Sequence, residues 1–282
     1  MPSTTLNLWA LAVSLAVSGA ISGCSNDRTT NPKIAELYEQ FYETGPSNPA
    51  ESRRAIAEAI AADPENAYSL YLRASLEAKD TPDQALETIR TGNGLSRCVI
   101  YVSAPPPEDS MRSLTRIRGM SALLGRDEIA GERLPEWAAA LRTMGRRVAQ
   151  AEPTASLAVL NGTAVVRAAY RAEIRFWEDA KQPDRAQALK EGLDRFEQWH
   201  SEMQAGLSAT LKDLVREAAR QAGMDERETA LYAAGKNVGD NAKQAKANRA
   251  KEAMFRREIE VLRAFLAKMP DVDGEPVPPT RP

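Results

Sequence analysis

Histidine and cysteine are scarce in this chain of 282 residues, which contains one histidine, His200, and two cysteines, Cys24 and Cys98. A zinc site needs several such ligands at helical or hairpin spacing, so we expect no metal site. Serine and cysteine nucleophiles commonly need a histidine base, and His200 alone is present to serve as one. We expect a surface or capping role for His200, which follows Trp199 on a helix flank, and no catalytic residues.

Phosphate-binding motifs and an excess of basic charge are also missing. No G-x-x-x-x-G-K-S/T occurs, and no G-x-G-x-x-G follows a strand-like segment, so we expect no nucleotide or other cofactor. The formal net charge is -2, with Lys and Arg well mixed among Asp and Glu. Because such a chain has no global basic field, we expect no nucleic-acid partner.

Charge is absent from the amino terminus, where the first 26 residues carry no charged side chain. Leu8 to Ser22 form an apolar run of 15 residues, and a helix that crosses a bilayer needs about 20. An apolar run followed by small residues is typical of a cleaved export signal. Two alternatives stay open: a soluble periplasmic product cut after Ala20 or Gly23, and a single uncleaved amino-terminal anchor.

The stretch ISGC, residues 21–24, resembles the lipobox of bacterial lipoproteins, in which a branched apolar residue and two small ones precede the modified cysteine. The resemblance implies cleavage between Gly23 and Cys24, a diacylglyceryl group on the Cys24 sulfur, and an acyl chain such as palmitate on the new amine. The preceding segment MPSTTLN departs from the family because it carries no Lys or Arg. Membrane lipid is therefore the first expected partner, bound through acylated Cys24.

Lipidation at Cys24 would place the folded part of the chain near a membrane. With two or three acyl chains on one residue, at ~0.8 kcal/mol per buried methylene, the attachment is effectively stable. By the resemblance to Gram-negative lipoproteins, Ser25 after the cysteine points to the outer membrane, facing the periplasm. The polar tether SNDRTT, residues 25–30, reaches about 20 Å at ~3.3 to 3.6 Å per residue.

Proline punctuates the next part of the chain and predicts four helix starts. A capping residue precedes proline in Asn31-Pro32, Asn48-Pro49, Asp63-Pro64 and Thr81-Pro82, which suits an N-cap followed by the first helical position. Glu51 and Gln84 lie three residues after two of these caps and complete possible capping boxes. The spacings of 17, 15 and 18 residues each fit one helix and a turn, so successive pairs form helical hairpins.

The hairpin period of 32 to 33 residues is close to the tetratricopeptide period of about 34. Residues 31–92 resemble a divergent pair of tetratricopeptide repeats, in which the usual tryptophan, Leu-Gly pair and tyrosine are not clear. An ordinary helical bundle is the open alternative. The matching residues are Ile56, Ala59, Pro64, Leu70 and Ala74, while Ala85 and Ile89 fall one residue early.

The helical pattern breaks over residues 93–109, which hold three consecutive prolines and the β-branched run CVIYV. We interpret this segment as a loop or short extended connection between two helical blocks. CVIYV suits a lone strand, but no partner strand is evident. Cys98 within it is expected to be a buried small hydrophobic residue, and with Cys24 lipidated it has no disulfide partner.

A second helical block is expected over residues 110–269, with helices that open near Pro135, Pro153 and Pro183. The segment after Pro183 is expected to return antiparallel to its predecessor, so that Phe176, Trp177, Phe196 and Trp199 meet across the hairpin. Asp225 with Glu228 predicts a capping box between the helix stops Gly223 and Gly235. The polar segment 236–251 suits a solvated linker, a helix start, or a basic face near anionic lipid. The proline-rich tail 270–282 should be disordered.

The sequence thus predicts an all-α protein of antiparallel helical hairpins, either tetratricopeptide-like or an irregular α-solenoid or bundle, behind a signal peptide (residues 1–23) and a lipidated tether (24–30). Stacked hairpins commonly serve as extended binding surfaces, so we expect a scaffold that binds an unidentified protein or peptide. An envelope hydrolase with paired carboxylates and a structural spacer are the alternatives. Four tyrosines are candidates for the binding groove or, equally, for the core: Tyr38, Tyr42, Tyr68 and Tyr71.

Overall fold

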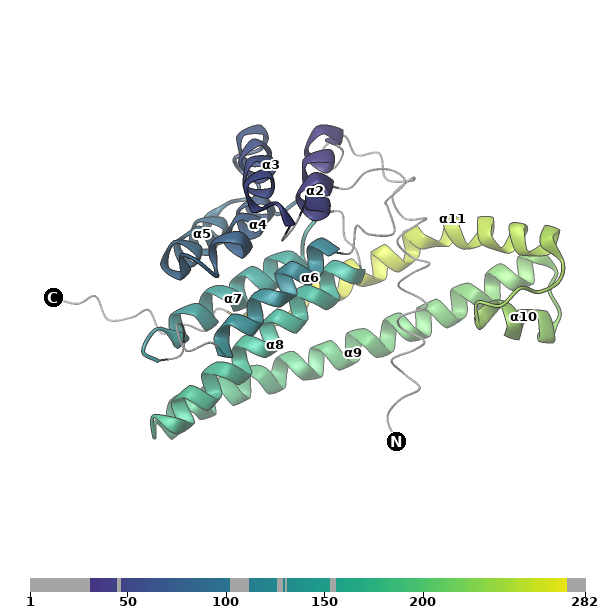
Figure 1. The fold of residues 1–282 in the computed structure, drawn as a ribbon. Helices are drawn as coiled ribbons and strands as arrows, with labels where there is room; N and C mark the ends of the chain where they lie inside the picture. The colour runs from purple at the N-terminus through teal and green to yellow at the C-terminus, as the bar shows by residue number, and fades with distance from the viewer. Residues whose placement is uncertain are drawn as a thin grey trace. The chain divides into compact units, whose positions relative to one another are not determined.

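The computed structural model describes residues 31–44, 47–101, 112–125, 129, 131–152 and 156–272. Within these ranges the regular structure is helical, and successive helices pack as hairpins (Figure 1), which confirms the all-α class. The chain divides into two compact units, and each is considered by itself here. The described residues of the first are 31–199 with 269–272, and those of the second are 200–268.

The first unit opens with two helical hairpins. The helices are α2 (Pro32–Thr44), α3 (Pro49–Ala62), α4 (Ala67–Glu77) and α5 (Pro82–Gly94), with α2 packed on α3 and α4 packed on α5. Three of the four predicted starts are confirmed, because α2, α3 and α5 each begin at the proline. The Asn48 side chain accepts a hydrogen bond from the Glu51 backbone amide at 3.3 Å, as an N-cap does.

Two details of the predicted capping pattern are wrong. Asp63-Pro64 forms a turn, not a helix start, and α4 begins three residues later with Asn66 as its N-cap. At α5 the Thr81 side chain makes no capping hydrogen bond and instead donates to the Glu77 carbonyl oxygen at 3.3 Å. Pro82 occupies the first helical position of α5, whereas Pro64 lies in the turn before α4. In both places, contacts outside the helix decide which residue satisfies the free amides.

Residues 97–101 are an extended segment built into the core of the first unit. The segment forms single parallel bridges to Asn66 and to Glu152, so it has partners on both sides that the sequence did not reveal. The Ile100 amide donates to the Glu152 carbonyl oxygen at 2.7 Å, and the Ala67 amide donates to the Arg97 carbonyl oxygen at 2.9 Å. The predicted connection at residues 93–109 therefore does not separate two cores.

Asn66 is the polar centre of this arrangement. Its buried side chain pairs with both backbone groups of Val99, accepting from the amide and donating to the carbonyl oxygen at 2.9 Å each. Its oxygen also accepts from the Tyr68 amide at 3.2 Å and caps α4, while its amide nitrogen donates to the Tyr38 hydroxyl at 3.2 Å. A single asparagine thus satisfies polar groups from two helices and the extended segment, which a buried site requires.

The rest of the first unit contains α6 (Arg112–Gly119), the 3-10 helix η3 (Met120–Gly125), α7 (Leu134–Ala149), α8 (Ser156–Asp179) and the first part of α9 (Pro183–Ala222). Two glycines set the close crossing of α7 and α8. A Cβ atom on Gly162 would lie 2.3 Å from the Gly145 carbonyl oxygen and 2.6 Å from the Ala149 backbone nitrogen. The two backbones touch at a distance that only glycine permits.

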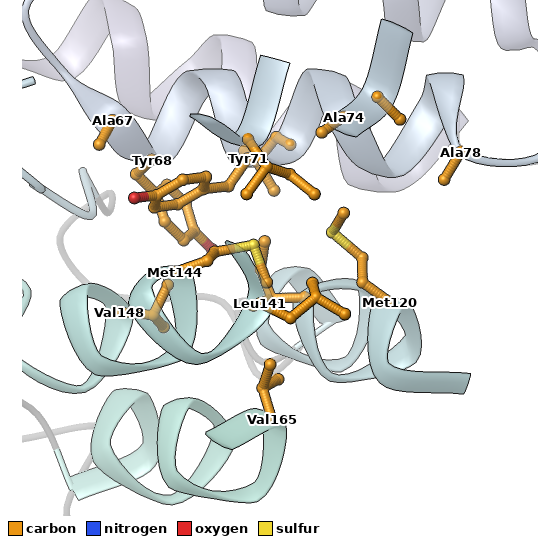
Figure 2. Packing of buried hydrophobic residues seen from close by; sticks show 14 of the residues in the cluster. Ala67, Tyr68, Tyr71, Ala74, Ala78, Met120, Leu141, Met144, Val148 and Val165 are labelled. Atoms are coloured by element: carbon orange, nitrogen blue, oxygen red, sulfur yellow. The ribbon is translucent and has the colours of Figure 1, made fainter. Parts of the chain in front are cut away.

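One hydrophobic core extends from α2 to α8. Figure 2 shows Tyr68 and Tyr71 of α4 directed into the space between α4 and α7, where Leu141 and Met144 lie, with Val165 of α8 beyond them. Because this core includes residues on both sides of the extended segment, the two blocks of the sequence fold around a common interior.

The first part of α9 returns antiparallel to α8, as expected. Ion pairs join Lys190 to Glu178 at 2.6 Å and Arg171 to Glu197 at 2.7 Å. Residue numbers increase along α8 from one pair to the other while they decrease along α9, as in antiparallel helices. The ring contacts differ from the prediction, since Phe176 stacks edge-on with Trp177 and Phe196 packs beside Trp199 within each helix. The Arg185 guanidinium crosses the hairpin and lies over the Trp177 ring at 4.4 Å.

The second unit is a helical hairpin formed by the later part of α9 and by α11 (Asn241–Leu266), joined through α10 (Glu226–Ala233). The capping box of Asp225 and Glu228 is confirmed, with both reciprocal hydrogen bonds present. Gly223 and Gly235, both with a φ of 71°, end the preceding helices as predicted. Gly206 of α9 makes room for the Phe265 ring of α11, which a Cβ would approach to 2.6 Å.

Residues 1–30 and 273–282 lie outside the described residues, and with them the predicted leader and most of the predicted tail. The first residues of the predicted tail are instead built into the first unit, because Val272 is buried and Asp271 pairs with Arg146 at 2.8 Å.

Candidate functional site

The candidate site is a small pocket in the first unit, between the end of α4 and the α6–η3 segment. Its volume is about 160 Å³. Small residues on both walls leave this space, because Ser75 of α4 and the C-cap residue Ala78 line one wall and Gly119 of α6 lines the other. A Cβ on Gly119 would meet nothing within 4 Å, so the pocket is open at that point. The full lining is Ser75, Ala78, Lys79, Arg116, Gly119, Met120 and Leu123.

Arg116 is held in place at this pocket by an aromatic ring. Its guanidinium lies over the Phe41 ring of α2, with 5.0 Å between the guanidinium carbon and the ring centroid. Such a cation–π contact contributes about 0.5 to 2 kcal/mol, depending on how far the cation is removed from water. Burial lowers the pKa of Arg116 from its ordinary value of 12.5, and the side chain still carries its charge at neutral pH.

Arg116 and Lys79 give the pocket a positive wall. Neither side chain has a carboxylate within 4.0 Å among the described residues, and no Asp or Glu lines the pocket. Met120 and Leu123 supply an apolar wall beside the charges. About 10 to 15 Å³ of such space admits one water molecule, so the pocket is large enough for one carboxylate-bearing side chain. The arrangement suits an anionic group attached to an apolar stem.

The four candidate tyrosines do not line this pocket. Tyr38, Tyr68 and Tyr71 are core residues with 1%, 0% and 0% exposure, so the core role is the one that they have. Tyr42 is half-buried and stacks edge-on with Phe41, which places it one residue away from the ring that holds Arg116. Burial raises the pKa of Tyr38 and Tyr71 well above the ordinary value of 10.0.

The hydroxyl groups of Tyr38 and Tyr71 are hydrogen-bonded within the fold. The Tyr38 hydroxyl lies 2.6 Å from the Ser69 hydroxyl, and the Tyr71 hydroxyl donates to Asn93 Oδ1 at 2.8 Å. Aromatic residues at helical spacing fit both a groove and a core, so the sequence alone left both roles open. Arg116 and Lys79 are far apart in the sequence, and no motif links them. The sequence could not predict that they share a pocket, because α4 and α6 meet only in the tertiary fold.

Carboxylates of α8 do not form an acid–base pair. Glu173, buried in the first unit, forms an ion pair with Arg142 and accepts a hydrogen bond from Trp177 Nε1 at 3.1 Å. The Arg142 guanidinium also lies over the Tyr170 ring, at 4.8 Å from its centroid. Glu178 on the same helix is exposed and paired with Lys190. Glu173 is thus engaged by a cation and an indole, and the paired-carboxylate hydrolase gains no support from these residues.

Cys98 and His200 are the described side chains closest to nucleophile or base chemistry; Cys98 is half-buried and His200 is buried. Cys98 packs against the core of the first unit, and burial raises the pKa of its thiol to about 12. His200 is 8% exposed and lies in the interior of the long helix α9, at the first residue of the second unit, so the expected surface or capping role is wrong. Phe196 and Met203, which lie on the same side of α9, are buried too, so His200 belongs to the buried face of this helix. Across the described ranges, no group of three His, Cys, Asp or Glu residues is arranged to hold a metal ion.

The predicted lipidation and cleavage residues, Gly23 and Cys24, lie outside the described residues. Within the part that the structure describes, no helix combines the length and apolar character needed to cross a bilayer. Comparison with known proteins returns no matching family model, no matching curated protein and no matching solved structure. The tetratricopeptide resemblance therefore stays a prediction, supported by starts of α2 and α4 that are 35 residues apart and starts of α3 and α5 that are 33 apart.

Proposed function

We propose that this chain is an exported lipoprotein whose helical domain is a scaffold that binds an acidic segment of another envelope protein. The observation that carries the binding role is the positive pocket of Lys79 and Arg116, beside the apolar Met120 and Leu123. Unlike most arginines of the first unit, Arg116 lies against an aromatic ring and has no carboxylate partner among the described residues. An acidic side chain on an apolar neighbour complements both parts of the pocket.

The anchoring half of the proposal is supported by the sequence ISGC at residues 21–24 and by the uncharged leader before it. Cys24 would carry the acyl chains and hold the domain on the periplasmic face of the outer membrane, within reach of the tether. Mass spectrometry of the mature amino terminus tests this half. A diacylglyceryl-modified Cys24 as first residue is expected, and Cys24→Ala should leave an uncleaved or unacylated chain. A full-length chain with a free thiol at position 24 would overturn it.

The binding half is tested with an acidic peptide array and its charge-neutral counterpart, in which each Asp is replaced by Asn and each Glu by Gln. The mature protein should bind members of the acidic array that pair a carboxylate with an apolar residue. Arg116→Gln should weaken binding about tenfold, because a charge-assisted hydrogen bond contributes roughly 1.5 kcal/mol or more.

Arg54→Gln is the matched control for charge, since Arg54 is exposed on α3 and outside the pocket lining. It should leave peptide affinity unchanged. Gly119→Leu fills the pocket from its open side and should block binding without removing a charge. Equal binding to the acidic and neutral arrays, or equal loss in Arg54→Gln and Arg116→Gln, would refute the pocket as the binding site and favour the structural spacer.

A further inference from the structure

The exposed face of α11 is a second surface with a distinctive charge. This helix has 26 residues and contains seven Lys or Arg against three Glu, in a chain whose net charge is -2. At 1.5 Å per residue it extends about 39 Å. Its inward face is fixed by packing, because Ala247, Leu262 and Leu266 are buried. The opposite face is therefore defined by helical geometry.

Basic residues gather on that opposite face. Lys246, Arg249 and Arg257 are separated by steps of three and eight, which a period of 3.6 brings to one side of the helix, and all three are exposed. Lys268, just beyond the helix end, is exposed as well. We call Lys246, Arg249, Arg257 and Lys268 the basic stripe. Exposed Arg263 borders the basic stripe. Among the described side chains, exposed Glu260 is an acidic residue on the same face.

The stripe differs from the other charged faces of the second unit in its lack of neutralising partners. On α9, Arg220 pairs with Glu217 at 2.7 Å and Arg216 with Asp213 at 3.8 Å. On the amino-terminal turn of α11, Lys243 pairs with Glu228 at 2.8 Å. For the four stripe residues the described part of the chain contains no such ion pair.

The residues between the cations are small. Ala245, Ala264 and Ala267 are exposed on or beside the stripe, and no large apolar side chain projects from it among the described residues. Long cationic side chains separated by alanines on one side of a helix reach an anionic surface without insertion of apolar groups into it. A concave acidic protein site would instead need a complementary shape. Single-stranded nucleic acid is usually bound with aromatic stacking groups, and the described side chains of this face include none.

We propose that the basic stripe of α11 binds the anionic headgroups of a lipid surface and so lays the second unit on the membrane. The choice of lipid as the partner rests on the proposed anchoring through Cys24, which would keep a bilayer within reach at high effective concentration. Binding is electrostatic, so it weakens as salt screens the charges, over a Debye length of about 10 Å at 0.1 M ionic strength. The stripe would act as a second attachment that depends on lipid charge, unlike the acyl chains.

The test uses the mature lipidated chain in vesicles of phosphatidylcholine and in matching vesicles that also contain phosphatidylglycerol. Ala264→Cys places a fluorophore beside the stripe, and labelling at neutral pH is selective because burial raises the pKa of the Cys98 thiol to about 12. Quenching by neutral acrylamide is expected to fall several-fold in the anionic vesicles alone and to recover at high salt. Flotation of the protein with both kinds of vesicle reports the acyl anchor separately.

Matched charge reversals complete the test. Lys246→Glu should abolish most of the protection in anionic vesicles, whereas Lys212→Glu, the same change on an exposed residue of α9, should leave it intact. Equal quenching in the two vesicle types, or equal loss in the two variants, overturns the proposal. Protection by duplex DNA in place of anionic lipid also overturns it. If Cys24 carries no lipid, the same chain added to preformed vesicles should still float in a salt-sensitive manner with the anionic set.

Discussion

At the residue scale, the most consequential polar groups of this protein are buried and engaged with one another. The side-chain amide of Asn66 pairs with the backbone of Val99 as the peptide group of a neighbouring strand would. It donates to the Val99 carbonyl oxygen and accepts from the Val99 amide. Arg142 and Glu173 join α7 to α8 with 4% and 10% of their side chains exposed. Burial of such groups is tolerated only when each finds a partner, so these contacts specify the packing of the helices that carry them.

Glu173→Gln should lower the free energy of unfolding by about 3 to 5 kcal/mol, because it leaves the buried Arg142 charge uncompensated. Glu178→Gln, which removes the exposed partner of Lys190, should cost about 1 kcal/mol or less. Urea unfolding of the two variants measures the difference. The double variant Arg142→Met with Glu173→Leu should recover most of the loss, and a Glu173→Gln protein as stable as wild type would contradict the account.

Cys98 provides a prediction with a defined pH dependence. Its thiol keeps the proton until the pH approaches a pKa of about 12, whereas the ordinary value is 9.0. At pH 9 the native thiolate fraction is therefore roughly a thousandth, and iodoacetamide should react several-hundred-fold more slowly than with an exposed thiol. Since the pKa is raised in the folded state, this group's contribution to stability is complete below pH 9 and is lost as the pH rises toward 12.

Alkylation rates of the mature chain, in which Cys24 is expected to be blocked by lipid, measure this prediction. The same chain in concentrated urea serves as the control, and there Cys98 should react at the ordinary rate. A native rate close to the unfolded rate at pH 9 would contradict the burial of this thiol.

At the element scale, the close crossing of α7 and α8 organises the first unit. Two long helices meet where Gly145 and Gly162 face each other, and the same pair of helices carries the buried ion pair and much of the core. The extended segment 97–101 then attaches to Glu152, just after α7, and to Asn66, just before α4. A strand-like run without a sheet is stable here because its polar groups are satisfied by single neighbours on each side.

Gly162→Ala tests this crossing. The new Cβ would lie 2.3 Å from the Gly145 carbonyl oxygen, so the two backbones must separate. We expect a loss of about 1 to 3 kcal/mol from overpacking, despite the better helix propensity of alanine. Gly94→Ala, at the end of α5 where a Cβ meets nothing within 4 Å, should be neutral or slightly stabilising. Thermal unfolding compares the two variants, and an equal midpoint for both would argue against the contact.

At the scale of the whole molecule, the chain combines two compact units that share α9, with the division at His200. The core of the first unit holds many large buried side chains, including Trp137, Phe41 and several tyrosines. The core of residues 200–268 relies more on alanine, as at Ala218, Ala219 and Ala222. Among the described residues, the largest fully buried side chains all belong to the first unit, so we expect a smaller free energy to hold the second unit closed.

Hydrogen exchange should therefore distinguish the two units in the native state. Amides of α11 and of residues 200–222 are expected to exchange through a sub-global opening, faster than the amides of α4, α7 and α8. Mass spectrometry of peptic fragments from the mature protein measures both sets at once. Indistinguishable exchange rates, each limited by global unfolding, would show that the units open together. Anionic vesicles should slow exchange in α11 if its basic stripe binds lipid.

The sequence by itself determined the helical class, most helix starts and stops, and the capping box at Asp225, because these depend on periodicity and on local backbone chemistry. It also carries the lipobox resemblance, which depends on covalent processing and not on folding. The tertiary structure alone decided that Asn66 caps α4, that the tyrosines are core, and that Arg116 and Lys79 share a pocket. Each of these rests on contacts between segments distant along the chain, and such contacts leave no local pattern in a single sequence.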